Sequence, residues 1–406
     1  MKVVWKGHLF YAVRAVIRKL PGIVIKAVPL PAPEIVSGIG ARSRAGELCR
    51  KNGFEQVLLV TDKTLFSLRL HEKIEESLQE QGIPCSVFSD ISSEPNLTII
   101  DNGRKALSDC RADAIIALGG GAVMDSCKMI AAGGRLKSRR SASLLHKFLF
   151  VRKKTLPIIA VPTTAGTGAE ITVGAVVTGN NGRKGSTVII GLDVREVILD
   201  GELTLKAPKG ITCACGIDAL SHGLEGAVAS VRVSEEDGRK SMECVKLVLE
   251  NLPILIREPE NTDARQNMFF AAHYGGNAIN KQLAGNVHAF AHSIGAKYHI
   301  SHGNAIARSL LPVMMLQKDK CLDKLAGLSR YCGLSDPTDS DTAACEKLLK
   351  KIGGLIELCA FEKGEPIPEE DYSELAKAVS LDSVNYSAPV VLNYKQIYDV
   401  LDAMNQ

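Results

Sequence analysis

Four of the nine histidines in this 406-residue chain fall within one short run, GNVHAFAHSIGAKYHISHG. The four are His288, His292, His299 and His302. His288 and His292 are four residues apart, so on a helix their side chains face the same way. Upstream, GIDALSHGLEG repeats this spacing with Asp218 and His222. Imidazoles and a carboxylate are ligand types that a divalent cation prefers.

The separation of His288 and His302 constrains how such a site can form. They are 14 residues apart, which is about 21 Å along a straight helix. Both can reach one ion only if the helix breaks between them, and Gly295 with the YHISHG turn is predicted to provide that break. We therefore expect two helices to contribute Asp218, His222 and His288, and a returning loop to deliver His302. Three imidazoles and one carboxylate suit Fe²⁺ or Zn²⁺ and leave room for a substrate oxygen.

Two glycine-bearing loops follow predicted strands. In LGGGAVMDSCKMIA, backbone N–H groups at a helix start can receive a pyrophosphate, because glycines allow its close approach. The glycines are Gly119, Gly120 and Gly121. The second loop, PTTAGTGAE, offers hydroxyls to phosphate or ribose oxygens from Thr163, Thr164 and Thr167. Two such loops at the carboxyl ends of strands predict a nucleotide crevice.

Asp62 ends the buried strand QVLLVTD. A carboxylate at this position can accept hydrogen bonds from both ribose hydroxyls and repels a 2′-phosphate, which favours NAD over NADP. Aspartate is also a frequent N-cap of a following helix. The residues alone support both interpretations equally.

The elements that must position these residues fall into two groups. From about Pro33, strands alternate with helices, which predicts a parallel sheet with crossovers on its faces. After VILDGELTLKAP the periodicity is helical to the C-terminus. We therefore predict a Rossmann-like α/β dinucleotide-binding domain over residues 33–206 and an all-helical metal-binding and catalytic domain over residues 207–406.

Residues 1–32 form a separate, basic extension. Apolar side chains recur at helical spacing among lysines and arginines, at Trp5, Leu9, Val13, Val16 and Leu20. No uninterrupted apolar core of a signal peptide or membrane span is present there. We favour an amphipathic helix packed on its own protein or on a neighbouring subunit, and anchoring of residues 1–22 at a membrane surface is the alternative.

The composition is that of an ordinary globular protein. Hydrophobic residues make up 46% and charged residues 23%, and the formal net charge is +4. No basic stripe interleaved with aromatics is present, which argues against a nucleic-acid partner. The 11 cysteines are scattered without metal or redox spacing, so we expect reduced thiols and a cytoplasmic location.

The segments GGGAVMDSCK, PTTAGTGAE, GIDALSHGLEG and HAFAHSIG through HISHG occur in a specific order and spacing. Together they resemble the iron-containing (group III) alcohol dehydrogenase family, from about Pro33 onward. The resemblance implies four metal ligands, which are Asp218, His222, His288 and His302. It also places His292 near the nicotinamide and the reacting oxygen, as a candidate for the proton route.

The same resemblance implies the cofactor contacts. The glycine triplet corresponds to the pyrophosphate loop, and Thr163 and Thr164 lie beside the cofactor. Further cofactor positions correspond to Asn96, Lys184 and Leu199. Asp62 corresponds to an aspartate that favours NAD. The expected activity is hydride transfer between a small alcohol or aldehyde and NAD(H), with Fe²⁺ as the first choice of metal, in a homodimer or larger homo-oligomer.

Some residues depart from the family pattern. Ala169 replaces a usual serine and Gly201 a frequent proline. Gly174 and Ile279 replace bulkier residues near the substrate, which predicts a roomier pocket.

Lys281 replaces a frequent asparagine and lies seven residues before His288, on the same predicted helical face. Its ammonium could favour an anionic aldehyde, although a lysine head that reaches solvent is the simpler interpretation. We expect His273 and His299 to be structural or pocket-rim residues.

Two other classes of protein remain as alternatives. A dehydroquinate-synthase-like lyase would also use NAD and a metal, but without net reduction of the cofactor. A non-catalytic scaffold or compartment protein is suggested by the N-terminal extension. The intact set of ligands argues against the second.

Overall fold

The computed structural model describes the residues 30–92, 95–134, 150–152, 154–179, 184–362, 364–383 and 386–406. Most of the predicted extension over residues 1–32 therefore lies outside the described residues. The chain forms two compact units. One comprises Val28–Lys206 and Glu260–Gly276, and the other comprises Ala207–Pro259 and Asn277–Gln406.

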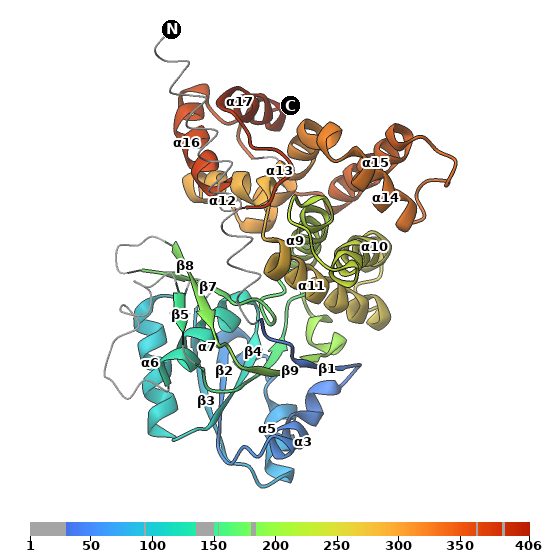
Figure 1. Ribbon diagram of the computed structural model, residues 1–406. Coiled ribbons are helices and arrows are strands. Elements are labelled where there is room, and N and C mark those ends of the chain that lie inside the picture. The colour runs from blue at the N-terminus through green and yellow to red at the C-terminus, as the bar shows by residue number, and fades with distance from the viewer. Residues whose placement is uncertain are drawn as a thin grey trace. The chain divides into compact units, whose positions relative to one another are not determined.

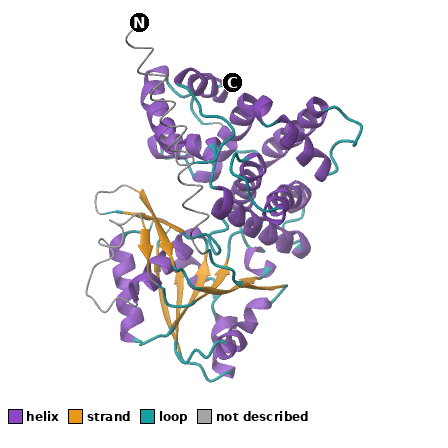
Figure 2. Cartoon of the chain, in the orientation of Figure 1, coloured by secondary structure: helices purple, strands orange, loops and turns teal. Residues whose placement is uncertain are grey.

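The first unit is built on a parallel sheet of six strands in the order β1-β9-β6-β4-β2-β3 (Figures 1 and 2). The strands are β1 (Glu34–Ser37), β2 (Val57–Asp62), β3 (Cys85–Ile91), β4 (Ala114–Gly119), β6 (Ile158–Pro162) and β9 (Val194–Leu199). This sheet and the helical second unit confirm the predicted fold class.

Helices cover both faces of the sheet, and the alternation of side chains explains why. Leu58 and Val60 of β2 contribute to a core with α6 (Leu97–Asp109) and α7 (Gly121–Gly134). Val57 and Leu59 point the other way, toward a core that includes residues of α3 (Ala45–Lys51) and α5 (Glu72–Glu80). A strand buried on both faces must be apolar throughout, as the runs VLLV and AIIAL are.

Because all six strands run the same way, their carboxyl ends lie along one edge of the sheet. From β2 the chain moves to β3 on one side and then returns to β4 on the other. The sheet therefore reverses its order between β2 and β4. Ligands of open α/β sheets bind at such a switch point, outside the carboxyl ends of the strands. The ends here are Asp62 and Gly119.

A second, three-stranded sheet in the order β5-β8-β7 was not predicted. It contains β5 (Phe150–Arg152), β7 (Gly174–Thr178) and β8 (Lys184–Ile190), with β7 antiparallel to β8. Lys128 and Asp125 of α7 hold β7 in place: the ammonium donates to the carbonyl of Gly174 at 2.7 Å, and the carboxylate accepts from the N–H of Val176 at 2.9 Å.

In its described residues the second unit contains helices joined by turns and loops, and no strand. They are α9 (Lys209–Val228), α10 (Glu235–Arg257), the C-terminal end of α11 (Thr262–Gln282), α12 (Asn286–Tyr298), α13 (His302–Gln317), α14 (Leu322–Tyr331), α15 (Asp341–Cys359), α16 (Tyr372–Ser383) and α17 (Tyr394–Met404), with short 3₁₀ turns between some of them. Helix α9 packs against α10, α13 and α14 and is buried on nearly every side. No helix in the described part of the chain is long and apolar enough to cross a membrane.

Candidate metal centre and cofactor loops

Helix α9 carries the first two predicted ligands one turn apart. Asp218 and His222 are both buried, and the Oδ1 atom of Asp218 lies 3.6 Å from Nε2 of His222. The four-residue spacing therefore brings the carboxylate and the imidazole together, as the sequence predicted.

The helix breaks between His288 and His302 at His299, within the predicted YHISHG turn, whereas Gly295 is not part of the break. Helix α12 ends at Tyr298, His299 has a left-handed φ of 55°, and α13 begins at His302. Gly295 lies inside α12, where a Cβ atom would be 3.3 Å from the carbonyl oxygen of Ile300. The glycine thus leaves room for the returning chain. His302 opens a helix and is not a loop residue, which corrects the prediction.

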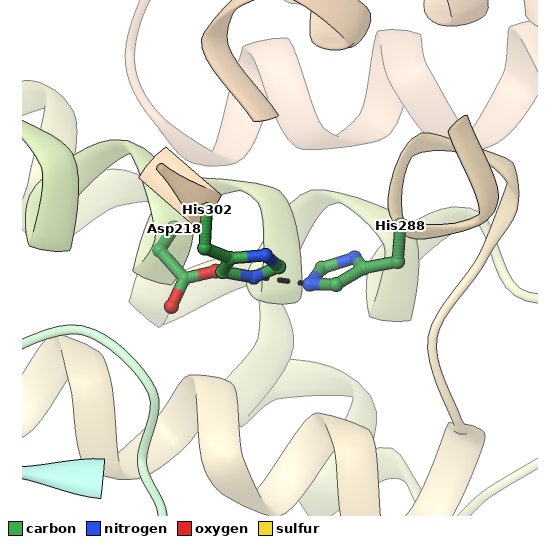
Figure 3. A group of neighbouring side chains, drawn as sticks. All are labelled: Asp218, His288 and His302. Atoms are coloured by element: carbon green, nitrogen blue, oxygen red, sulfur yellow. Dashed lines mark ion pairs between the residues drawn. The ribbon is translucent and has the colours of Figure 1, made fainter. Parts of the chain in front are cut away.

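Imidazoles of the three predicted histidine ligands lie around Oδ1 of Asp218. Among the described residues, only His288 and His302 form with it a group whose ligand atoms are all within 4.8 Å of one another, and His222 is not part of that group. Asp218 Oδ1 lies 3.7 Å from Nε2 of His288 and 3.2 Å from Nε2 of His302, in addition to the contact with His222. Figure 3 shows the side chains of Asp218, His288 and His302 pointing toward one another, and their ligand atoms all lie within 4.8 Å. Ligand atoms bound tetrahedrally at about 2.1 Å from a cation lie about 3.4 Å apart. The observed separations bracket that value.

The same atoms lack other partners. Asp218 Oδ1 and His288 Nε2 are buried and make no hydrogen bond with any residue that the structure describes. Such an orphaned buried polar group costs about 1–3 kcal/mol, and a cation between the two atoms would remove that cost. The donor set therefore fits a divalent metal ion.

Burial and charge act in opposite directions on these groups. Burial would raise the pKa of Asp218, but the imidazoles of His222 and His302 hold it well below its usual value. Burial lowers the pKa of His222 to about 4, so this imidazole is neutral and able to bind a cation. Burial would lower the pKa of His288 as well, but the carboxylates of Glu225 and Asp218 raise it to about 10.

Sequence reasoning missed Glu225, which contacts His288 directly. Its Oε2 atom lies 2.6 Å from Nδ1 of His288. Glu225 is seven residues after Asp218 on α9, about two turns further along the same face. That spacing was the signal that could have identified it.

His292 lies at the rim of the cluster. Its side chain is 45% exposed, and its ring centroid lies 5.4 Å from that of His302. Nδ1 of His292 is 3.0 Å from the hydroxyl of Tyr386 and 3.4 Å from Oδ2 of Asp382. Tyr386 and Asp382 are about 90 residues away in sequence, and no local pattern indicates them.

In the α/β unit, the two predicted cofactor loops lie side by side. The N–H of Thr163 donates to the carbonyl of Gly119 at 3.1 Å. A Cβ atom on Gly120 would lie 3.1 Å from the hydroxyl of Thr164. One on Gly121 would lie 3.4 Å from Thr167. The glycine turn therefore opens α7 directly beside the threonine loop.

The other predicted cofactor residues lie on several different elements of the α/β unit. Asp62 is the N-cap of α4 (Lys63–Ser67), because its Oδ1 accepts from the N–H of Leu65 at 2.8 Å. Asn96 caps α6 in the same way. Leu199 ends β9 at the same sheet edge as Asp62. Lys184 begins β8, and its side chain lies outside what the structure describes. The N-cap interpretation of Asp62 is thus confirmed, without excluding a contact with ribose.

The predicted substrate residues belong to different units of the chain. Gly174 begins β7, and Ile279 is half-buried on α11. Histidine 273, also on α11, pairs with the buried Glu170 at 3.2 Å, in line with the structural role expected of it.

Lys281 does not share a helix with His288. Helix α11 ends at Gln282, and Leu283 has a left-handed φ of 63°. The expectation of one continuous helical face is therefore wrong. Burial would raise the pKa of Asp237, but hydrogen bonds and the charge of Lys281 hold it below its usual value, so the ammonium lies near a carboxylate.

Taken separately, the two units define a class: metal-dependent dehydrogenases that combine a dinucleotide-binding sheet with a helical metal centre. Residues 32–192 match the family model described as iron-containing alcohol dehydrogenase, and residues 212–405 match the C-terminal model of the Fe-containing alcohol dehydrogenase family. The chain belongs to the iron-containing alcohol dehydrogenase family. It is therefore an oxidoreductase that interconverts alcohols and aldehydes.

Similar proteins span the whole of both domains. The NAD-dependent methanol dehydrogenase of Bacillus methanolicus is 29% identical over 91% of this chain and 97% of its own length. The probable alcohol dehydrogenase EutG of Salmonella typhimurium is 30% identical over 93% and 94%. Among solved structures, a 1,3-propanediol oxidoreductase matches with a TM-score of 0.85 and 27% identity, over 93% of this chain and 99% of its own. A sulfoacetaldehyde reductase of Bifidobacterium kashiwanohense, in complex with NAD⁺, matches with a TM-score of 0.84 and 25% identity, over 93% and 98%.

Proposed function

We propose that this chain is an NAD(H)-linked, metal-dependent enzyme that oxidises a small alcohol or reduces the corresponding aldehyde. One observation carries the proposal: three imidazole Nε2 atoms surround Asp218 Oδ1 at 3.2 to 3.7 Å, the separation that ligands of one cation require. Relatives named as NAD-dependent methanol dehydrogenase and lactaldehyde reductase support the cofactor and the substrate class.

The metal ligands are Asp218, His222, His288 and His302. Fe²⁺ is the metal we propose, with Zn²⁺ as the competitor, since imidazole and carboxylate ligands suit both ions and cellular supply decides between them. When bound, the cation supplies a Lewis acid that polarises the substrate oxygen. The ligand residues would hold it with three imidazole nitrogens and a single carboxylate.

The cofactor binds at the carboxyl edge of the six-stranded sheet. Backbone N–H groups of the turn Gly119, Gly120 and Gly121 bind the pyrophosphate at the start of α7. The neighbouring hydroxyls belong to Thr163, Thr164 and Thr167, and the remaining contacts come from Asp62, Asn96, Lys184 and Leu199. The nicotinamide supplies the hydride acceptor and donor. Asp62 disfavours a 2′-phosphate and so selects NAD.

His292 exchanges a proton with the substrate side of the centre. Tyr386 and Asp382 engage Nδ1 of this imidazole, which leaves Nε2 for the exchange. Its partial exposure connects it to solvent, as a proton route requires. The role of His292 is thus to move a proton, and the two partner side chains hold its ring in place.

Neutral substrates are favoured, in a pocket that is roomier than is common in the family. Glycine at 174 and isoleucine at 279 leave space where bulkier residues are common in the family. The nearby Asp237 offsets the charge of Lys281, which argues against selection of an anionic aldehyde by that lysine. The enzyme works as a cytoplasmic homo-oligomer; the free thiols of all its cysteines support a reducing compartment.

The decisive experiment uses protein stripped of metal. We expect aldehyde-dependent oxidation of NADH to disappear on chelation and to return with Fe²⁺, or to a lesser extent Zn²⁺. His288→Ala should lose both the bound metal and turnover, because one of four ligands is removed. Full activity of His288→Ala in metal-free buffer would refute the site. A dehydroquinate-synthase-like lyase would instead show no net change in NADH absorbance at steady state.

A further inference from the structure

Glu225 is a buried carboxylate beside the metal centre, and it is not one of the four predicted metal ligands. Glu225 is only 3% exposed, yet three donors surround it. Its Oε2 faces Nδ1 of His288 at 2.6 Å and accepts from the N–H of Gly285 at 2.8 Å. Its Oε1 accepts from the N–H of Val287 at 2.6 Å. A buried charge is tolerated when it is this fully hydrogen-bonded.

The two backbone donors decide how the bond to His288 runs. Backbone N–H groups can only donate, so both oxygens of Glu225 serve as acceptors. When the His288 imidazole is neutral, Nδ1 must then carry its proton, which leaves the lone pair on Nε2. Nε2 is the atom that lies 3.7 Å from Asp218 Oδ1 without a hydrogen-bond partner. Glu225 thus selects the tautomer that can bind a cation.

The glycine at position 285 is explained by the same contact. Gly285 precedes α12 with φ −131°, a conformation open to any residue. A Cβ atom there would lie 2.5 Å from Oε1 and 2.8 Å from Cδ of Glu225. Only lack of space therefore excludes a side chain, and the occupied space belongs to the carboxylate of Glu225.

We propose that Glu225 is the positioning residue of the metal centre. It fixes the tautomer and ring orientation of His288, and Gly285 leaves the room that its carboxylate needs. The inference rests on the proposed function because it takes His288 to be a ligand. Loss of such an outer hydrogen-bond partner lowers metal affinity by about 10- to 100-fold, and we expect that loss here.

The test compares four variants of the full chain. Glu225→Gln replaces one acceptor oxygen by an NH₂ group, which is a donor. At least one of the three donors that now face Glu225 would then face this NH₂ group and lose its acceptor. Gly285→Ala keeps every atom of Glu225 and His288 but displaces the carboxylate. Glu236→Gln and Gly238→Ala are matched controls on α10, since Glu236 has a 75% exposed side chain and a Cβ on Gly238 meets nothing within 4 Å.

Zn²⁺ affinity is measured by competition with a chelator, and the absorption spectrum of bound Co²⁺ reports the ligand field. Circular dichroism of the metal-free proteins checks the fold.

The inference is supported if Glu225→Gln and Gly285→Ala each bind Zn²⁺ at least 10-fold more weakly than their controls and shift the Co²⁺ spectrum. The circular dichroism of both variants without metal should be unchanged. If Glu225→Gln does not fold, Gly285→Ala decides alone. Zn²⁺ affinity within twofold of the control in a folded variant overturns the inference while the metal site stands. Failure of the wild type itself to bind stoichiometric Zn²⁺ overturns the proposed function, and the inference with it.

Discussion

Lys128 allows a test of how the α/β unit holds the strand that bears Gly174. The lysine is 2% exposed, and its ammonium donates three hydrogen bonds. The acceptors are Asp125 Oδ1 at 2.9 Å, Thr172 Oγ1 at 3.1 Å and the Gly174 carbonyl at 2.7 Å. Lys128→Met keeps most of the side-chain volume and removes the charge, so all three acceptors lose their donor.

The expected cost follows from what is left behind. Removal of one partner from a buried ion pair costs about 3–5 kcal/mol, because the remaining charge is uncompensated. The carboxylate of Asp125 is 16% exposed and still accepts from the N–H of Val176. We therefore expect the lower end, about 3 kcal/mol. Asp125→Asn in the same chain should recover part of it, because no charge is then stranded.

Hydrogen exchange read by mass spectrometry is the suitable assay, since a chain of two units need not unfold in one step. Peptides that cover β7 should show a free energy of opening lower by about 3 kcal/mol in Lys128→Met. Lys105→Met, at an exposed lysine on α6, is the matched control. A loss below about 1 kcal/mol would refute the reasoning, because an exposed ion pair already accounts for that much.

Three further predictions follow from single contacts. Gly168→Ala should destabilise the protein by more than Gly333→Ala, as measured by thermal melting: both glycines have a positive φ, but only at Gly168 would a Cβ collide with backbone atoms, at 2.5 Å. Asp62→Asn should keep the helix cap and raise kcat/KM for NADPH relative to kcat/KM for NADH. Asp62→Ala should change the cofactor preference in the same way and also lower the free energy of unfolding by about 1 kcal/mol, because the cap is lost. The same cofactor preference in the wild type and both variants would argue against a ribose contact. Tyr386→Phe removes one hydrogen bond to His292, worth about 1 kcal/mol, so kcat should fall about fivefold with KM unchanged; an unaltered kcat would exclude a part for this hydroxyl.

The sequence predicted what short-range geometry determines. Continuous apolar runs predicted the buried strands β2 and β4. The four-residue spacing predicted the pairs on α9 and α12, because helical periodicity is a property of the backbone. The histidine cluster and the expected helix break also included His302 in the site, although its contact with Asp218 spans 84 residues. These are the parts of the site whose pattern is visible in one stretch of chain.

The remainder depends on tertiary contacts that no local pattern encodes. The pairing of β7 with β8 is supported by Lys128, which lies 46 residues before Gly174. Leu283, in a left-handed conformation, lies between the end of α11 and the start of α12. Leucine is not a residue type that indicates a turn, so the sequence wrongly predicted that Lys281 and His288 share one helical face. The spacing of Glu225 from Asp218 indicates a shared face of α9, but it does not indicate the partners of Glu225, a histidine and two backbone N–H groups that are 60 or more residues away.

The polar content of α9 links the metal to the stability of the helical unit. Asp218, His222 and Glu225 all lie within a helix that is buried on nearly every side. Glu225 is compensated by three donors from the start of α12, but Asp218 Oδ1 has no hydrogen-bond partner among the described residues. A buried carboxylate oxygen surrounded by imidazoles is costly without a cation and favourable with one. The free energy of cation binding therefore also stabilises the packing of α9 against α12 and α13, so loss of the metal should loosen these helices before it affects the parallel sheet.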